Sequence, residues 1–308
     1  MINYSIIIPH KDIPDLLQRC LDSIPVRSDV EVIVVDDNSD PRKVDFDDFP
    51  QWKGNNYQYF LTKEGKGPGY ARNVGLDHAK GRWIVFADAD DFFTEDFNDL
   101  LDEMIDAVAE VVFFDYINVL SDDVTQQLEE RVWFRHFIAD YLNGDKSEFG
   151  LRTGFVVPWC KLVKRELIEQ NHIRFDEVMW GEDVYFAVQI GYFAQAIDVS
   201  GTIGYTVTSR RGQITENIYQ TAKEFRVRME GHLKVDDLLK PQYGPHAKSE
   251  TILGYVLRKK GLFKCTWFCV ANIFYPQIFW RTALFLTKLI VYKMKKTYWR
   301  LRAYLRNN

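Results

Sequence analysis

The chain has 308 residues, enough for one large domain or two smaller ones. Hydrophobic residues make up 46% and aromatic residues 15%, which supports a packed core and excludes an intrinsically disordered chain. The net charge of −5 conceals a division, because residues 251–308 hold twelve Lys and Arg and no acid, whereas residues 1–250 carry −17. A body this acidic disfavours nucleic acid as a partner.

Residues 1–120 alternate between short apolar runs and helical patterns. The Ile- and Val-rich runs predict buried strands, and apolar residues at helical spacing predict helices, the first of them with Asp12 as its N-cap. The predicted strands cover residues 4–9, 30–37, 57–62, 82–91 and 110–119, and the predicted helices cover 13–24, 69–81 and 95–108. This alternation predicts an α/β domain with a mostly parallel sheet.

The pattern is looser after residue 120. Helices are predicted at residues 128–142, 164–171, 183–194 and 217–239. We find no internal repeat and no low-complexity segment.

Polar clusters follow three of the predicted strands. They are His10-Lys11-Asp12, Asp36-Asp37-Asn38 and Asp88-Ala89-Asp90-Asp91. In a parallel sheet, ligands bind beyond the carboxyl ends of the strands, so all three clusters are expected on one rim.

Asp88 and Asp90 form a pair of carboxylates on one short turn. Their mutual repulsion becomes favourable around Mg²⁺ or Mn²⁺, which bind one or two carboxylates together with substrate phosphates. We therefore expect half of a metal site, held loosely without its ligand. The alternative is a helix start capped by Asp91 or Thr94.

Three other stretches carry candidate chemistry. Asp37 can accept a hydrogen bond from a ribose or a base, or belong to an ordinary turn. The segment EGKGPGYARNVGL is a weak phosphate-binding signal, with Arg72 placed to face the acidic rim. Glu182 and Asp183, beside Trp180, are either helix-capping acids or a general base next to an aromatic wall.

Six motifs in order resemble the inverting family-two glycosyltransferases of GT-A fold, especially bacterial enzymes of capsule, exopolysaccharide or O-antigen synthesis. They are SIIIPHKD, VVDDNSD, GPGYARNVGL, GRWIVFADADD, WCKLVKRELI and WGEDVYF, and the likeness covers roughly residues 2–215. It implies a catalytic domain at 1–215, with nucleotide-sugar binding at about 1–120 and the acceptor side at about 120–215. Residues 216–308 form a helical extension.

The resemblance also implies roles for individual residues. The donor is a nucleotide-diphospho-sugar, commonly a UDP-sugar, with Mn²⁺ or Mg²⁺ as cofactor; Asp90 is the direct metal ligand, supported by Asp88, and Asp183 is the general base. The donor-side residues it implies are Pro9, His10, Asp12, Asp37, Arg72, Asp88, Ala89, Arg210 and Arg211. The acceptor-side residues are Trp159, Lys161, Trp180 and Glu182. Because His10 stands where the family has an aromatic residue, base stacking is expected to shift to it.

The basic C-terminal segment is rich in aromatic residues but is interrupted by Lys264, Pro276, Arg281 and Lys288. A membrane-spanning helix is therefore not expected. Interfacial helices on an anionic membrane surface fit better, and a helical pair packed on the catalytic domain is the alternative. The four cysteines lie singly among apolar residues and no signal peptide opens the chain, so we expect a cytoplasmic protein, bound peripherally to the inner face of the membrane.

Two other functions stay open. A non-catalytic nucleotide-sugar-binding module would bind a glycan-assembly donor without turnover. A nucleotidyltransferase would carry a basic glycine-rich loop after the first strand, and PHKDIPDLL has none.

Overall fold

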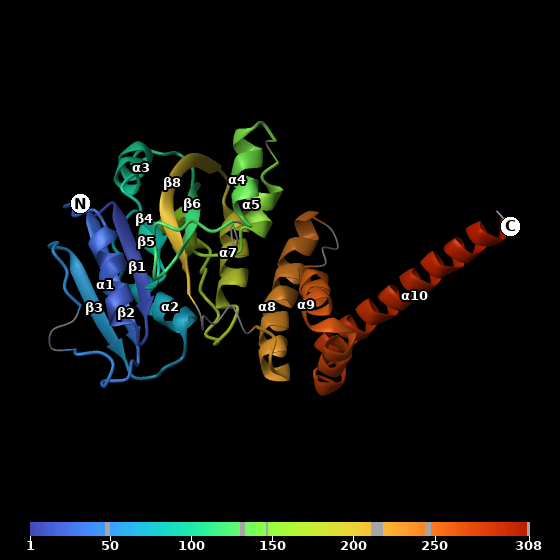
Figure 1. Cartoon of the computed structure of the whole chain (residues 1–308). Helices are drawn as coiled ribbons and strands as arrows, with labels where there is room; N and C mark the ends of the chain where they lie inside the picture. Colours follow the sequence, from blue (N-terminus) through green and yellow to red (C-terminus); the bar gives the residue numbers. More distant parts are fainter. Residues whose placement is uncertain (47–49, 130–132, 146, 211–217, 244–247, 307–308) are drawn as a thin grey trace. The chain divides into compact units, whose positions relative to one another are not determined.

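The computed structural model describes residues 1–46, 50–129, 133–145, 147–210, 218–243 and 248–306. The chain divides into two compact units, Met1–Glu216 and Asn217–Asn308. Figure 1 shows the sheet in the first unit and helices in the second.

Unit 1 is built on one eight-stranded sheet of order β3-β2-β1-β4-β7-β6-β8-β5. The strands are β1 Tyr4–His10, β2 Val30–Asp37, β3 Tyr57–Thr62, β4 Trp83–Phe86, β5 Phe92–Phe93, β6 Val111–Leu120, β7 Lys161–Lys164 and β8 Ile197–Ser209. Only β7 and β5 run against the other six, because each pairs antiparallel with its neighbours. The predicted α/β fold with a mostly parallel sheet is confirmed.

Helices flank this sheet and help to bury β1, β2 and β4 completely. They are α1 Pro14–Ser23, α2 Pro68–His78, α3 Phe97–Met104, α4 Arg135–Leu142, α5 Phe149–Gly154, α6 Arg165–Gln170 and α7 Glu182–Phe193. Every residue of β1, β2 and β4 is buried, as their continuous apolar runs require. The parallel register sets His10 opposite Asp36, so the polar ends of β1 and β2 lie side by side.

Unit 2 contains α8 Ala222–Tyr243, α9 Lys248–Ala271 and α10 Pro276–Arg306. A backbone break at Gly261, with φ 82°, divides α9. The three helices share a core that includes Phe225, Met229, Val256 and Phe268. No helix among the described residues is long and apolar enough to cross a membrane.

The sequence patterns missed β5, β7 and β8, the strands that complete the sheet beyond β4. β8 contains Gly, Ser and Thr, and its pairing with β6 is interrupted by register shifts, so it has no clean two-residue alternation. The predicted helix at 128–142 is shorter among the described residues, beginning at Arg135.

The prediction of Asp12 as an N-cap was wrong. Ile13 occupies that position, and Asp12 adopts a left-handed backbone with φ 61°. The Asp12 carboxylate accepts instead from the Asp40 amide at 2.7 Å and pairs with Lys43 Nζ at 3.0 Å. Asp12 therefore joins the β1 end to the loop that follows β2.

Candidate active site

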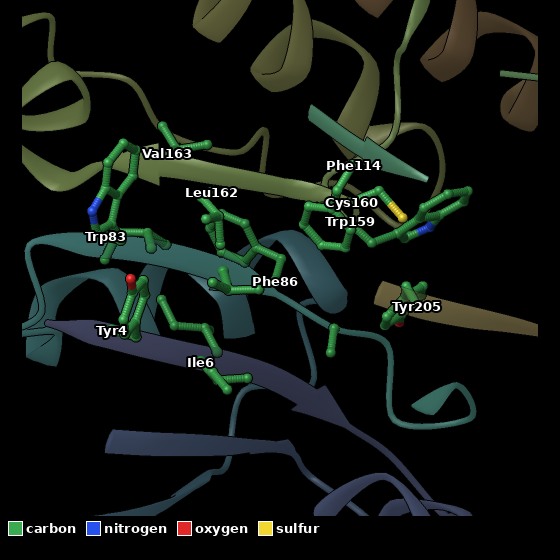
Figure 2. Close-up of a cluster of buried hydrophobic side chains, with 14 of the residues drawn as sticks. Tyr4, Ile6, Trp83, Phe86, Phe114, Trp159, Cys160, Leu162, Val163 and Tyr205 are labelled. Atoms are coloured by element: carbon green, nitrogen blue, oxygen red, sulfur yellow. The ribbon is translucent and has the colours of Figure 1, made fainter. Parts of the chain in front are cut away.

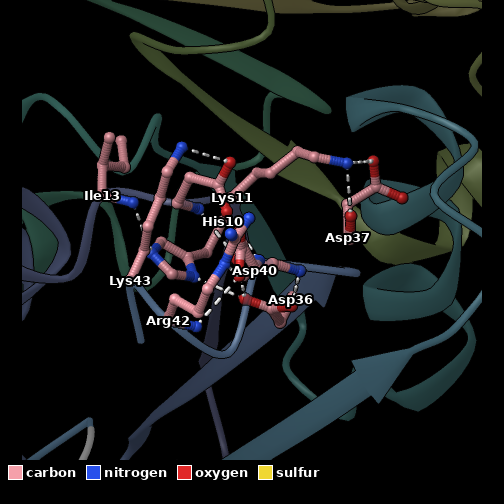
Figure 3. A network of polar contacts seen from close by, with 10 residues as sticks. His10, Lys11, Ile13, Asp36, Asp37, Asp40, Arg42 and Lys43 are labelled. Atoms are coloured by element: carbon pink, nitrogen blue, oxygen red, sulfur yellow. Dashed lines mark hydrogen bonds and ion pairs between the residues drawn. The ribbon is translucent and has the colours of Figure 1, made fainter. Parts of the chain in front are cut away.

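The ends of β1 and β2 form a buried polar network (Figure 3). His10 Nδ1 donates to Asp36 Oδ2 at 2.7 Å, and its Nε2 accepts from the Ile13 amide at 3.2 Å. Since the His10 ring is buried and held at both nitrogens, the expectation that it stacks on a base was wrong. Pro9 is also buried within β1. Both residues therefore belong to the buried interior at the end of β1.

Asp37, one residue further along β2, has a different environment. Its Oδ2 accepts from the Gly67 amide at 2.9 Å and lies 3.6 Å from Lys11 Nζ. Gly67 adopts φ 99°, a conformation that glycine tolerates and that brings its amide to the carboxylate. The other oxygen, Oδ1, is buried without a hydrogen-bond partner among the described residues. Asp37 can therefore accept one more hydrogen bond from a ligand.

Asp88 and Asp90 lie partly exposed in the turn after β4. Arg72 Nη2 donates to Asp88 Oδ1 at 2.6 Å, and Arg210 Nη2 lies 3.6 Å from Asp90 Oδ2. Burial raises the pKa of Asp90, and the charge of Asp88 raises it further. This turn is a site of concentrated negative charge that a bound cation relieves.

The third acid of this turn, Asp91, is buried and faces β8. Its Oδ1 accepts from the Thr208 amide at 2.7 Å. The Tyr205 hydroxyl, also on β8, accepts from the Asp88 amide at 2.9 Å. Burial raises the pKa of Asp91 well above its ordinary value.

The carbonyl of Asp90 is held as well. It accepts from Arg19 Nη2 at 2.6 Å and from Thr208 Oγ1 at 2.7 Å. The expectations of a loosely held turn and of Asp91 or Thr94 as a helix cap were therefore wrong, since β8 fastens the turn and Thr94 donates to the Ile203 carbonyl.

Arg72 joins the Asp88 turn to the start of α7. The second terminal nitrogen of its buried guanidinium, Nη1, donates to Glu182 Oε1 at 3.0 Å. Close packing of α2 makes this bridge possible, because a Cβ at Gly69 would lie 2.2 Å from the Asp176 carbonyl oxygen and 3.0 Å from Glu182 Cβ. With both terminal nitrogens on carboxylates, Arg72 positions the acids of the site.

Asp183 follows Glu182 in the first turn of α7 and is half-buried. Burial raises its pKa to about 7, with the charge of Glu182 adding to this shift and the charge of Arg72 opposing it. A carboxylate with this pKa accepts protons effectively near neutral pH. Trp180, half-buried, lies just before it, and Gly181 makes the left-handed step into α7.

Trp159 and Lys161 were predicted to contact an acceptor, but both side chains are buried, at 8% and 2% exposure. The Trp159 ring stacks on Tyr205 with a centroid distance of 5.8 Å (Figure 2). Lys161 Nζ donates to the Val157 carbonyl and lies 4.3 Å from the Phe155 ring centroid. Their predicted acceptor contacts were wrong, because the patterns did not show that β7 lies inside the sheet.

Ala89 is buried within the turn, and Arg211 lies outside the described residues. The patterns missed three residues that hold the turn, namely Arg19, Tyr205 and Thr208. Two of them stand on the unrecognised strand β8, and Arg19 reads as one polar position on a helix. No sequence signal distinguished them.

Asp88 and Asp90 fit a divalent cation as two partly exposed carboxylates on one turn. No group of three or more acids, His or Cys suited to a metal is found among the described residues. Mg²⁺ and Mn²⁺ take one or two carboxylates when phosphate oxygens complete the coordination. The turn therefore suits a metal that arrives with a diphosphate.

Replacing Arg72 with Met is expected to reduce the free energy of unfolding of unit 1 by about 3 kcal/mol, because Asp88 and Glu182 are left without their cation. Urea unfolding followed by Trp fluorescence measures this loss. Arg72→Lys, which keeps the charge but not the two-armed bridge, should lose less. An unchanged urea midpoint for Arg72→Met would contradict the bridge.

Replacing Lys161 with Met is expected to stabilise the protein by about 1–3 kcal/mol at pH 7. Burial lowers the pKa of Lys161 to about 7 from its ordinary 10.5. Between these values the unfolded chain binds a proton that the folded chain does not, so wild-type stability rises with pH across this window. Thermal melts at pH 7 and pH 10 should show the gain at pH 7 and its decline at pH 10; equal gains would contradict the buried charge.

A family model described as "Glycosyl transferase family 2" matches residues 5–171. The glycosyltransferase GlyA of Streptococcus pneumoniae is 25% identical over 68% of this chain and 31% of its own length. The putative glycosyltransferase EpsH of Bacillus subtilis is 24% identical over 59% of this chain and 53% of its own. The chain thus corresponds to only a third to a half of these relatives.

Among solved structures, residues 1–349 of TarS from S. aureus in complex with UDP-GlcNAc superpose with a TM-score of 0.58. The match covers 87% of this chain and 81% of that one at 19% identity. At this identity the match concerns the fold alone, and it confirms the predicted GT-A fold.

Proposed function

The chain belongs to glycosyl transferase family 2, and we propose that it transfers a sugar with inversion from a UDP-sugar to a glycan or polyprenyl-linked acceptor. The observation that carries this proposal is the Arg72 bridge. It brings Asp88, in the carboxylate turn, together with Glu182, the neighbour of Asp183. A phosphate-side acid cluster and a proton acceptor are the two parts that such a transfer needs.

We propose that Asp37 recognises the nucleotide base. Its partnerless, buried Oδ1 suits a ring N–H such as that of uracil. The UDP-GlcNAc complex of TarS, a protein of the same fold, supports a uridine donor. Lys11 and the Gly67 amide hold the other side of the carboxylate, so the orientation of Asp37 is set before the donor binds.

Asp90, with Asp88, would hold Mn²⁺ or Mg²⁺. When bound, the metal supplies Lewis-acid stabilisation of the departing diphosphate. Arg19, Thr208 and Tyr205 keep the turn in place through hydrogen bonds to its backbone. Arg210, next to Asp90, is positioned to contribute positive charge on the diphosphate side.

Asp183 acts on the acceptor. Its carboxylate removes the proton from the acceptor hydroxyl as that oxygen attacks the anomeric carbon from the face opposite the leaving group. One displacement of this kind inverts the configuration. Burial makes the carboxylate basic enough to take this proton near neutral pH. Trp180, half-buried just before it in the chain, is the aromatic side chain on which an acceptor sugar would stack.

The enzyme is proposed to act in bacterial surface-polysaccharide synthesis, with residues 1–120 serving the donor and residues 120–215 the acceptor. Its proposed location is the inner face of the cell membrane, as a peripherally bound protein. The charge division of the chain supports this location, because all twelve basic residues of 251–308 occur without an acid.

A donor screen tests the function. Purified full-length protein is incubated with UDP-, GDP-, dTDP- and CMP-sugars, with Mn²⁺, Mg²⁺ or EDTA, and release of the nucleotide is measured. We expect UDP from a UDP-sugar only when a divalent ion is present. Donor binding without release, even with acceptor glycans supplied, would identify a non-catalytic binding module. Turnover of nucleoside triphosphates would identify a nucleotidyltransferase.

A further inference from the structure

The α9–α10 region of unit 2 exposes a row of large apolar side chains. Phe263, Trp267 and Val270 follow one another at intervals of three or four residues, which places them on one side of α9, and Phe274 lies in the turn that follows this helix. Phe263 is 86% exposed, Trp267 41% and Phe274 90%. Trp280, in the first turns of α10, is exposed as well. We call these five residues the hairpin patch.

The hairpin patch is not needed to complete the core of unit 2. Cys265 and Phe268 point inward from the same stretch of α9, and Ile278 does so from α10. The Phe268 ring stacks on Phe225 of α8 at 4.5 Å. Unit 2 is therefore packed by one side of α9, and the patch side stays in solvent. Contiguous exposed apolar surface of this kind marks an interaction site.

The charges around the patch indicate the partner. Arg258, Lys259 and Lys260 precede Phe263 in the chain, on the other side of the backbone break at Gly261, and Lys264 lies within the row. No Asp or Glu occurs in the chain after residue 250, and Arg281, next to Trp280, is paired with Asp236 of α8 at 3.9 Å. The Lys264 ammonium lies 4.5 Å from the Trp267 ring, so basic and aromatic groups share this surface. Such a surface fits an anionic partner with an apolar layer beneath its charges.

We propose that the hairpin patch docks on an anionic lipid surface. Its Phe and Trp side chains enter the interfacial region, the flanking Lys and Arg contact the headgroups, and the helices lie on the membrane without crossing it. The inference rests on the membrane location in the proposed function and names the residues that make the contact. Anchoring at this surface would hold the enzyme where lipid-linked acceptors are concentrated.

Vesicle flotation with the full-length protein tests the aromatic part. Vesicles of phosphatidylcholine alone are compared with vesicles of equal parts phosphatidylcholine and phosphatidylglycerol. Phe263→Ser, Trp267→Ser and Phe274→Ser, combined in one chain, are expected to weaken binding to the mixed vesicles about a hundredfold. The matched control combines Val108→Ser, Trp133→Ser and Leu142→Ser, which remove exposed apolar side chains of unit 1. It should change binding by less than about twofold.

A second variant tests the charges. Arg258→Gln, Lys259→Gln and Lys260→Gln together should weaken binding to the phosphatidylglycerol vesicles about a hundredfold, at about 1 kcal/mol per charge. Raising the salt concentration should weaken wild-type binding in the same direction. Thermal melts of all variants, expected to match wild type, report on their folding.

Three results would overturn the proposal. The first is a wild-type protein that floats with neither kind of vesicle, and the second is a patch variant that floats like wild type. The third is a wild-type protein that binds no vesicles but is a dimer in light scattering, when the patch variant is a monomer; the patch would then be a contact between two copies of the chain. UDP binding, measured by calorimetry on the same samples, separates this inference from the proposed function. Vesicle binding without UDP binding would contradict the proposed function and support the docking surface.

Discussion

Asp183→Asn is expected to reduce kcat by about 10²–10⁴-fold while the Kd for the UDP-sugar stays within about twofold of wild type. Asn has nearly the same shape as Asp but cannot accept the acceptor proton. Asp183 is proposed to act on the acceptor, so donor binding does not depend on its charge. Steady-state transfer assays measure kcat, and calorimetry with the UDP-sugar in the absence of acceptor measures the Kd.

The pH dependence of the wild-type enzyme provides a second measure of the same group. Burial raises the pKa of Asp183 to about 7, and only the ionised carboxylate takes a proton. We therefore expect kcat/KM to fall about tenfold per pH unit below pH 7 and to level off above it. Near-normal turnover of Asp183→Asn, or a flat profile between pH 5 and pH 7, would exclude Asp183 as the base.

The same pKa predicts an effect on stability. In the folded chain Asp183 keeps its proton up to about pH 7, whereas in the unfolded chain it ionises near its ordinary value of 3.8. Between these values the folded state binds more protons, so the wild-type chain loses stability as pH rises. Asp183→Asn should therefore melt higher than wild type at pH 8, and the difference should decline toward pH 4. If the variant is more stable but less active than wild type, its loss of turnover does not result from unfolding.

Asp90→Asn is expected to reduce kcat/KM by about 10³-fold or more, because the cation that stabilises the leaving diphosphate contributes several kcal/mol. The metal readout is independent of turnover. Calorimetric binding of Mn²⁺ in the presence of UDP should weaken strongly in the variant. UDP binding in EDTA should change little, since the base is proposed to be held by Asp37.

The matched control for Asp90 is Asp96→Asn. Asp96 is an exposed carboxylate just before α3 and makes no side-chain capping bond there. The Asp96→Asn substitution removes the same charge six positions after Asp90, so it should leave both Mn²⁺ binding and turnover within about twofold of wild type. Equal losses in the two variants would indicate a general charge effect and contradict a metal site at the turn.

Much of the proposed donor side could be predicted from the sequence, because its signals are local. Apolar runs such as SIIIP and VEVIVV need no partner to be recognised as buried strands, and parallel strands end at the same edge of a sheet. The placement of Asp37, Asp88 and Asp90 at strand ends depends only on these two facts. The division of the chain into an acidic part and a basic, aromatic C-terminal segment likewise follows from composition alone.

The partners of these acids depended on contacts between distant parts of the chain. Arg72 meets Glu182 across 110 positions, and Asp91 meets Thr208 across 117. The strand β8 supplies Tyr205 and Thr208, and its sequence shows no regular alternation of apolar and polar residues. Its residues are buried because neighbouring strands pack beside it, and a pattern within the strand does not record this. The patterns therefore left Asp91 as a possible helix cap, and the family resemblance placed Trp159 and Lys161 on the acceptor side, without any sign that these side chains are buried.

By itself, the sequence determined the α/β class, the family and the edge of the sheet at which the acids gather, because periodicity and motif order depend only on residues close together in the chain. Only the tertiary structure decided the surroundings of each acid, on which the proposed roles rest. Asp91 is turned inward to β8, Asp37 keeps one oxygen without a partner, and burial near Glu182 makes Asp183 basic. These distinctions arise from burial and pairing, which depend on what the fold brings next to each carboxylate.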